Sequence, residues 1–167
     1  MNEMKQIQVE KVTVNMGAGE VGDEVDKAVN LLEQLTGKEP VKTESSRAAQ
    51  GFGLRGGLNI GAKVTLRGEE AEEFLEYVFE AKGDEISRDV FDTQGNFSVG
   101  VEEYIDMPNV SYDPDIGMKG FDVAVTLERP GHRVKRREED REVGGDHGIS
   151  EEDARQYVKE RFDVELV

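Results

Sequence analysis

The stretch Gly51-Phe-Gly-Leu-Arg-Gly-Gly-Leu-Asn-Ile-Gly-Ala-Lys-Val-Thr-Leu-Arg67 joins a glycine-rich loop to a segment of alternating character. From residue 59 to 67, apolar side chains alternate with polar ones, which predicts a strand with one buried face and one wet face. The wet face carries Lys63, Thr65 and Arg67. Between residues 41 and 67, five cations oppose one acid, a net charge of +4 in a chain of formal net charge -16. This basic island predicts an anionic partner.

The length and composition fit one ordinary domain. A chain of 167 residues can bury a core, although the apolar fraction of 36% makes that core modest. Without cysteine there is no disulfide framework, thiolate metal site or cysteine nucleophile, in agreement with a reducing cytosol. No stretch approaches the roughly 20 apolar residues of a membrane helix, and no signal core is present. We expect a cytoplasmic protein without a membrane partner.

The chain is strongly acidic, with 37 acidic against 21 basic residues. Such a balance normally argues against a nucleic-acid partner, because binding to phosphates requires a positive face. Here the distribution of charge matters more than the sum. A salt-rich cytoplasm would screen the self-repulsion of an acidic surface, so we expect a halophilic source.

The pattern of apolar residues predicts three amphipathic helices. They begin at Asp23 and end at Gly37, span residues 69–81, and run from a Ser150–Asp153 capping box through Arg161. Alternation predicts strands at 41–43, 59–67, 97–101, 121–127 and 164–166, and two short pieces over 7–14 that join at a bulge near residue 10.

These elements indicate an α+β fold, a single domain with a mostly antiparallel sheet layered with amphipathic helices on one face. Its core covers about residues 6–131. A basic-then-acidic extension (132–149) and a final helix and strand (150–167) follow. The second face of the sheet is then free to bind a partner.

Three motifs have simple structural interpretations. Gly17-Ala-Gly-Glu-Val-Gly22 has dinucleotide-binding spacing, but acids stand where a pyrophosphate would lie, so we favour a tight strand-to-helix turn and keep a nucleotide-binding enzyme as a minor alternative. Asp113-Pro-Asp-Ile-Gly117 lacks the acid that would complete a calcium loop and predicts a turn. His132 and His147 have no nearby ligand set, and we expect both on the surface. We therefore predict no catalytic residue, metal or cofactor.

Two basic stretches remain. Each could be only a solvated charged segment. As an RNA surface, Lys63 and Arg67 would reach phosphates, and Phe52 would stack on a base beside glycines that permit close approach. The second stretch carries Arg129, Arg133, Lys135, Arg136 and Arg137 without an acid.

Seven blocks in order give the chain a wider resemblance. They are Val12-Thr-Val-Asn-Met-Gly-Ala-Gly-Glu20, Leu35-Thr-Gly-Lys-Glu-Pro-Val41, Gly51-Phe-Gly-Leu-Arg55, Ile60-Gly-Ala-Lys-Val-Thr-Leu-Arg-Gly68, Phe91-Asp-Thr-Gln-Gly-Asn-Phe-Ser-Val-Gly100, Tyr112-Asp-Pro-Asp-Ile-Gly117 and Val125-Thr-Leu-Glu-Arg-Pro-Gly131. Together they resemble the large-subunit ribosomal protein L-five family in its archaeal and eukaryotic form, over nearly the whole chain.

The resemblance implies a structural, non-enzymatic constituent of the large ribosomal subunit. Such a protein binds 5S rRNA in the central protuberance, and contacts large-subunit rRNA, peptidyl-site tRNA and neighbouring ribosomal proteins, including a small-subunit bridge protein. The expected rRNA site comprises Asn15, Met16, Lys38, Phe52, Arg55, Lys63, Thr65 and Arg67. The loop from Thr43 to Gln50, with Ser45, Ser46 and Arg47, corresponds to the tRNA-contacting loop. A further RNA contact is possible at Arg133, Lys135, Arg136 and Arg137.

The sequence departs from the family pattern at two places. The Thr-Gly block continues with Lys38 and Glu39 instead of glutamine and lysine, and the tRNA loop has Arg47 as its only cation. A diverged protein-interaction module of the same fold, with weakened RNA binding, is therefore the principal alternative.

Overall fold

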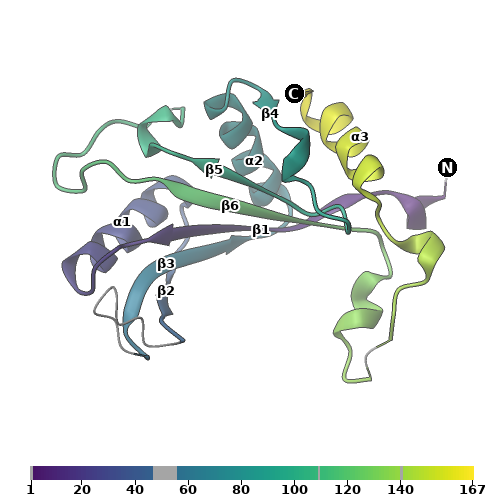
Figure 1. Ribbon diagram of the computed structural model, residues 1–167, viewed down its shortest axis with the longest axis horizontal. Helices are drawn as coiled ribbons and strands as arrows, with labels where there is room; N and C mark the ends of the chain where they lie inside the picture. The colour runs from purple at the N-terminus through teal and green to yellow at the C-terminus, as the bar shows by residue number, and fades with distance from the viewer. Residues whose placement is uncertain (1, 47–55, 109, 140) are drawn as a thin grey trace. The chain divides into compact units, whose positions relative to one another are not determined.

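The structure is a computed structural model that describes residues 2–46, 56–108, 110–139 and 141–167. Its main sheet has five strands in the order β2-β3-β1-β6-β5 (Figure 1). They are β1 (Gln8–Gly17), β2 (Val41–Glu44), β3 (Asn59–Leu66), β5 (Phe97–Val101) and β6 (Phe121–Glu128). A separate parallel pair joins β4 (Glu85–Ile86) to β7 (Glu165–Leu166).

Three α-helices accompany the strands: α1 (Asp23–Thr36), α2 (Glu69–Ala81) and α3 (Glu151–Phe162). Short 3-10 helices are η1 (Glu3–Lys5), η3 (Arg88–Val90), η4 (Tyr104–Asp106), η5 (His132–Arg136) and η6 (Gly145–His147). No helix in the described part of the chain is long and apolar enough to cross a membrane.

Local contacts define the strand directions in the sheet. β2 pairs antiparallel with β3, with Val41 opposite Lys63. The Ala18 amide donates to the Ile60 carbonyl at 2.8 Å, so β1 ends where β3 begins. The Leu127 amide donates to Asn96 Oδ1 at 3.2 Å, so β6 ends beside the start of β5. β1 is therefore antiparallel to β3, and β6 is antiparallel to β5. The predicted α+β fold is confirmed.

β1 differs from its prediction because it is one uninterrupted strand of 10 residues. The expected change of phase is present within it. Val9 and Val12 are both buried, with half-buried Glu10 and Lys11 between them. The backbone continues through this slip in the alternation, because the hydrogen-bonded ladder outweighs the local pattern.

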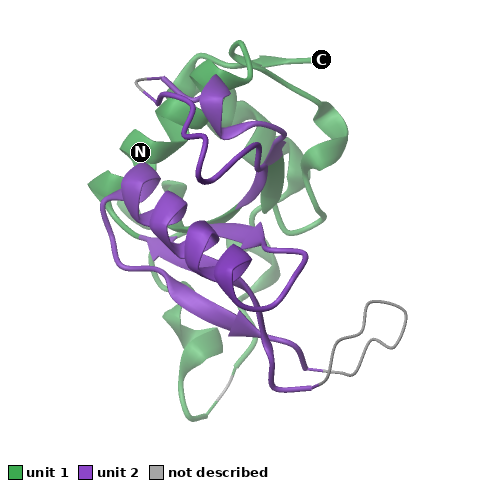
Figure 2. Cartoon of the chain, turned by 90° about the vertical axis from the view of Figure 1, so that its left-hand side faces the viewer, with its two compact units in different colours: residues 1–12, 67–99, 124–167 green, residues 13–66, 100–123 purple. Residues whose placement is uncertain are grey.

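By the density of their contacts, the residues form two compact units, coloured separately in Figure 2. Unit 1 contains residues 1–12, 67–99 and 124–167, and unit 2 contains residues 13–66 and 100–123. The division falls inside β1, β5 and β6, so these strands contribute residues to both units.

The core of unit 2 forms where α1 packs against β3 and β2. The helix buries Val25, Ala28, Leu31 and Leu32, β1 buries Val14 and Met16, and β3 buries Ala62 and Val64. α1 begins after Gly22, and Gly37 ends it with φ 70°, a left-handed conformation that glycine adopts readily. The segment before α1 is the predicted strand-to-helix turn.

The core of unit 1 is aromatic. Phe79 of α2 stacks on Phe97 of β5 with a centroid separation of 6.4 Å, and contacts Phe162 of α3 at 5.2 Å. The predicted capping box of α3 is present: Ser150 Oγ accepts from the Asp153 amide, and the Asp153 carboxylate accepts from the Ser150 amide, each at 3.2 Å. These two bonds satisfy amide groups that a helix start leaves unpaired.

Candidate nucleic-acid interface

The predicted basic face lies on β1 and β3 within unit 2. Val14 and Met16 are buried, so Asn15 between them points to the opposite side and is exposed. By the same alternation Lys63 is exposed and Thr65 is half-buried on β3. The structure thus brings three of the predicted RNA contacts onto one wet face.

Gly61 allows these two strands to approach closely. A Cβ atom at Gly61 would lie 2.5 Å from the Met16 carbonyl oxygen and 3.0 Å from Thr43 Oγ1. Any side chain here would collide with backbone, so glycine is required for the pairing of β1 with β3. Gly61 itself is buried beneath this neighbouring backbone and the Thr43 hydroxyl.

Met16 departs from its prediction, because its side chain belongs to the core. It is 1% exposed. Only its backbone can face a partner, since strand alternation turns the thioether toward α1 while Asn15 faces outward.

The basic island divides between the two faces of the sheet. Lys42 pairs with Ala62 in the β2–β3 register, which turns its side chain toward α1, where Nζ lies 2.9 Å from Asp26 Oδ1. Lys63 and Arg67 are exposed and have no ion-pair partner among the described residues. Of the cations in the island that the structure describes, these two are available to phosphates.

Val41 was not among the predicted contacts but belongs to this face. It lies directly opposite Lys63 in the register and is 61% exposed. A wet valine on an edge strand can pack against a sugar or base. The sequence contains a signal for it, because Val41 and Thr43 alternate with Lys42 and Glu44, but the alternation alone does not tell which face is buried.

The base of the predicted tRNA loop is part of the sheet. Thr43 lies in β2, the Ser45 amide donates to the Leu58 carbonyl at 2.8 Å, and the Gly57 amide donates to the Ser45 carbonyl at 2.7 Å. Ser45 is 8% exposed, so its hydroxyl is not presented to a partner as expected. Ser46 is exposed.

Several predicted contacts are located differently. Arg47, Gln50, Phe52 and Arg55 lie outside the described residues. Lys38 is half-buried in the turn that follows α1, where its amide donates to Thr36 Oγ1 at 3.4 Å.

The second basic run contains one cation that is already paired within unit 1. Arg136 contacts the Glu10 carboxylate through Nη1 and lies 3.3 Å from Glu128 Oε2 through Nη2. Glu10 is only 7% exposed in its side chain and Glu128 17%. Arg133, Lys135 and Arg137 are exposed. Arg136, one of the possible further RNA contacts, therefore uses its charge to hold η5 on β1 and β6.

The histidines are also not where the sequence predicted them. His132 is 5% exposed and His147 is half-buried. His132 Nε2 donates to the His147 carbonyl at 2.9 Å, and His147 Nε2 donates to the Pro130 carbonyl at 2.7 Å. The rings meet edge to face at 5.4 Å. The pair fastens the extension to the end of β6.

Glu24, an acid at the start of α1 just after the Gly17–Gly22 turn, has structural partners. Hydrogen bonds from Lys119, at 2.7 Å, and Lys27, at 3.0 Å, hold the pKa of the Glu24 carboxyl below its usual value. Glu24 therefore remains charged at the start of α1, where it occupies the position that a pyrophosphate would need.

The predicted turn at 113–117 is present too, with the Gly117 amide 3.0 Å from the Asp113 carbonyl. No group of three metal-ligating side chains occurs among the described residues.

Two family models cover most of the chain. The model of ribosomal protein L5 matches residues 2–55, and the model of the C-terminus of the same ribosomal family matches residues 59–160. The chain belongs to the ribosomal protein L5 family.

Archaeal relatives match along the full length. The large ribosomal subunit protein uL5 of Sulfurisphaera tokodaii is 46% identical over 100% of this chain and 96% of the relative. The proteins of the same name from Methanobrevibacter smithii and Methanococcus vannielii are 43% and 45% identical. They cover 100% and 98% of this chain, and 99% and 93% of the relatives.

Proposed function

We propose that the chain binds 5S rRNA through the wet face of β1 and β3. Asn15, Lys63 and Thr65 form this surface in unit 2, and Arg67 follows β3 directly. Phe52, Arg55 and Lys38 are further proposed contacts. The family relation makes the chain a structural constituent of the large ribosomal subunit in the cytoplasm, and we assign it no enzymatic role.

The observation that carries the RNA site is that Lys63, an exposed lysine on a polar face, lacks an acidic partner among the described residues. Lys63 has no acidic partner among the described residues, although the chain has 37 acids. Lys63 can contact a phosphate directly, because no internal ion pair must be broken first. Asn15 and Thr65 on the same face supply hydrogen-bonding groups for sugar and phosphate oxygens.

Contacts with peptidyl-site tRNA and with a small-subunit bridge protein remain part of the proposal. For tRNA, support comes from the position of the loop, whose two ends are closed by the hydrogen bonds at Ser45 and Gly57. These bonds join the two ends of the loop beside β2, an edge strand of the sheet, and connecting segments of this kind often carry binding residues.

A salt titration of 5S rRNA binding tests the site, with Lys63→Ala and Lys42→Ala as a matched pair. Both substitutions remove one positive charge from neighbouring strands, but Lys42 points toward Asp26 on α1. Lys63→Ala should weaken binding and reduce the slope of log affinity against log salt by about 0.7 to 0.9, the contribution of one phosphate contact. Lys42→Ala should change neither the affinity nor the salt slope beyond experimental error.

Equal effects of the two variants would refute the assignment to this face. Equal affinity of the unmodified protein for 5S rRNA and for an unrelated RNA of the same length would refute 5S recognition itself. It would favour the diverged protein-interaction module instead. For the enzyme alternative, the Glu24 ion pairs at the glycine turn predict that nicotinamide and flavin nucleotides leave the melting temperature unchanged.

A further inference from the structure

A shallow cavity of about 280 Å³ lies on the wet face of the main sheet, within unit 2. It crosses the ends of the neighbouring strands β1, β6 and β5 (Figure 1). Pockets for whole small ligands typically have volumes of about 300 to 1,000 Å³, so this cavity suits a smaller group, such as one planar ring system. Its exposed lining residues are Asn15, Gly17, Gly100, Glu102, Gly120 and Asp122.

Two glycines of the cavity are not explained by the packing of the described residues. Gly17 and Gly100 lie in β1 and β5, and neither has the left-handed backbone that favours glycine. A Cβ atom at Gly17 would meet no described atom within 4 Å, and one at Gly100 would make an ordinary contact, 3.4 Å from Asp122 Oδ1. Glycine weakens a strand, and it often marks a place where a ligand closely approaches the backbone. The two glycines therefore indicate a ligand that lies on the strands.

The carboxylates beside these glycines are free hydrogen-bond acceptors. Asp122 of β6 extends over Gly100, and Glu102 follows β5 directly. Neither carboxylate has a hydrogen bond or ion pair with another described residue. A carboxylate only accepts hydrogen bonds, and it repels a phosphate. The group that enters the cavity must therefore present donors and carry no negative charge.

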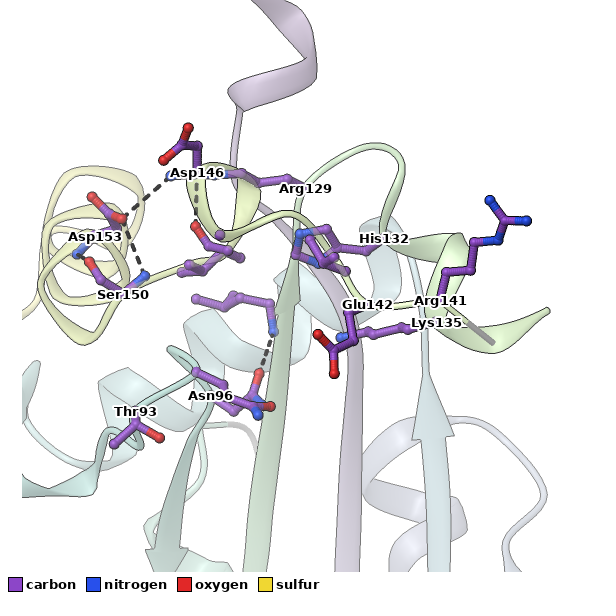
Figure 3. Close-up of a pocket in the computed structure, with 16 residues that line it drawn as sticks. Thr93, Asn96, Arg129, His132, Lys135, Arg141, Glu142, Asp146, Ser150 and Asp153 are labelled. Atoms are coloured by element: carbon purple, nitrogen blue, oxygen red, sulfur yellow. Dashed lines mark hydrogen bonds and ion pairs between the residues drawn. The ribbon is translucent and has the colours of Figure 1, made fainter. Parts of the chain in front are cut away.

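The large cavity of unit 1 differs in this respect (Figure 3). It has a volume of about 920 Å³, but several of its polar side chains are bonded within the protein. Asn96 Oδ1 accepts from the Leu127 amide, and the Asp153 carboxylate accepts from the Ser150 amide, each at 3.2 Å. The Asp122 carboxylate has no such internal bond among the described residues, so it is available to a ligand.

The smaller cavity continues the proposed RNA face. The hydrogen bond from the Ala18 amide to the Ile60 carbonyl sets the pairing of β1 with β3, and three residues further along each strand Asn15 lies beside Lys63. β1 lies between β3 and β6. Lys63 and Asp122 are therefore two strand spacings apart across the sheet, roughly 10 Å. A nucleotide whose phosphate contacts Lys63 can place its base in the cavity.

We propose that the cavity binds an unpaired guanine of the bound RNA, which lies on Gly17 and Gly100 and donates to the Asp122 carboxylate. The inference rests on the RNA-binding function proposed above. The Watson–Crick edge of guanine has two neighbouring donors, the N1 and N2 hydrogens, which match the two oxygens of a carboxylate. Adenine and cytosine present a donor beside an acceptor, and uracil presents one donor between two acceptors. Each of these three bases would set an acceptor against Asp122.

An arginine of a partner protein is the competing ligand, because a guanidinium also presents two parallel donors to a carboxylate. The charge of the neighbouring face favours RNA. Lys63 beside Asn15 is an exposed cation without an ion-pair partner among the described residues, and it would repel an arginine-rich segment while attracting a phosphate.

Fluorescence anisotropy of the full chain with labelled RNA pentamers tests the proposal. UUGUU, UUAUU, UUCUU and UUUUU have the same phosphates and differ only in the central base. UUGUU should bind about tenfold more tightly than the other three, which corresponds to about 1.4 kcal/mol, as expected for one bidentate contact to a base. If UUGUU binds no more tightly than UUAUU, the proposal is overturned.

A matched pair of charge variants locates the guanine. Asp122→Asn replaces one acceptor oxygen with a donor and should reduce the guanine preference to about twofold or less. Glu103→Gln also removes one negative charge, from an exposed residue that does not line the cavity, and should leave the preference at about tenfold. Equal effects of the two variants would overturn the assignment to Asp122.

Gly100→Ala separates binding from folding. The added methyl group has room in the free protein but occupies the surface on which the base lies. It should weaken UUGUU binding by a factor of about 5 or more, whereas the melting temperature should stay the same or rise. Unchanged binding would overturn the proposed position of the base. Binding of a hexa-arginine peptide that Asp122→Asn abolishes, together with pentamers that bind equally, would assign the cavity to a protein partner and overturn the RNA assignment.

The guanine site and the 5S rRNA function can fail separately. Selective binding of 5S rRNA with the expected effect of Lys63→Ala, but without any preference for UUGUU, would overturn the guanine site alone. Equal affinity for 5S rRNA and an unrelated RNA would instead overturn the function on which the guanine site rests.

Discussion

Replacement of Arg136 tests whether this cation stabilises the fold or is available to bind RNA. Arg136 contacts Glu10 and Glu128, whose side chains are 7% and 17% exposed. Arg136→Ala would leave two poorly hydrated carboxylates beside each other on β1 and β6. Exposed pairs contribute about 0.2 to 1 kcal/mol, and breaking a buried pair costs about 3 to 5 kcal/mol. Since Arg136 is 44% exposed while its partners are mostly covered, we expect a loss of about 1.5 kcal/mol.

Thermal and urea unfolding measure this loss. For a chain of 167 residues, about 1.5 kcal/mol should lower the melting temperature by about 3 to 6 °C. Adding Glu10→Gln to Arg136→Ala should restore part of the stability, because it removes one of the two uncompensated charges. Arg137→Ala, an exposed neighbour with the same charge change, should leave the melting temperature within about 1 °C. Equal destabilisation by the two arginine variants, or no rescue by Glu10→Gln, would refute the structural role of Arg136.

Gly61→Ala should destabilise the fold by about 2 to 3 kcal/mol in urea unfolding, because the new Cβ would lie 2.5 Å from the Met16 carbonyl oxygen and the strand would have to move. Unchanged stability would mean that the two strands are further apart than described. Ser150→Ala should cost about 1 kcal/mol through loss of the α3 cap, and Ser150→Thr much less, as measured by the same method. The lowered pKa of Asp153 gives a further test. Because its folded pKa lies below the ordinary 3.8, its contribution is complete above that value and disappears as the pH falls through the folded pKa. The stability difference between the unmodified chain and Asp153→Asn should accordingly stay constant above about pH 5 and shrink toward about pH 3, and an increase instead would reverse the assigned sign.

The helices could be predicted from the sequence because their ends are local. Gly37 ends α1 and the Ser150–Asp153 box begins α3, and both signals act within a few residues. The alternation of β3 and β6 likewise follows from burial of one face. By contrast, β4 and β7 have two residues each, too few to show a period, and they pair across about 80 residues of chain.

The placement of some proposed site residues on the sheet could be predicted from the sequence. Lys63 and Asn15 reach the same face because alternation in each strand is unambiguous. The direction of Lys42 depends on the pairing of β2 with β3, which four residues of mixed character do not reveal. The engagement of Arg136 depends on a carboxylate that lies 126 residues earlier, at Glu10. A run of cations in the sequence gives their number but not which of them are already paired.

The interlocked histidines make the extension observable by NMR. The chain has 2 histidines, and both belong to the pair at the end of β6. Each ring donates through Nε2 to a backbone carbonyl, so Nε2 of both rings should appear protonated in nitrogen-15 spectra. Imidazole signals therefore come only from this place. They would report detachment of the extension without a substitution anywhere in the protein.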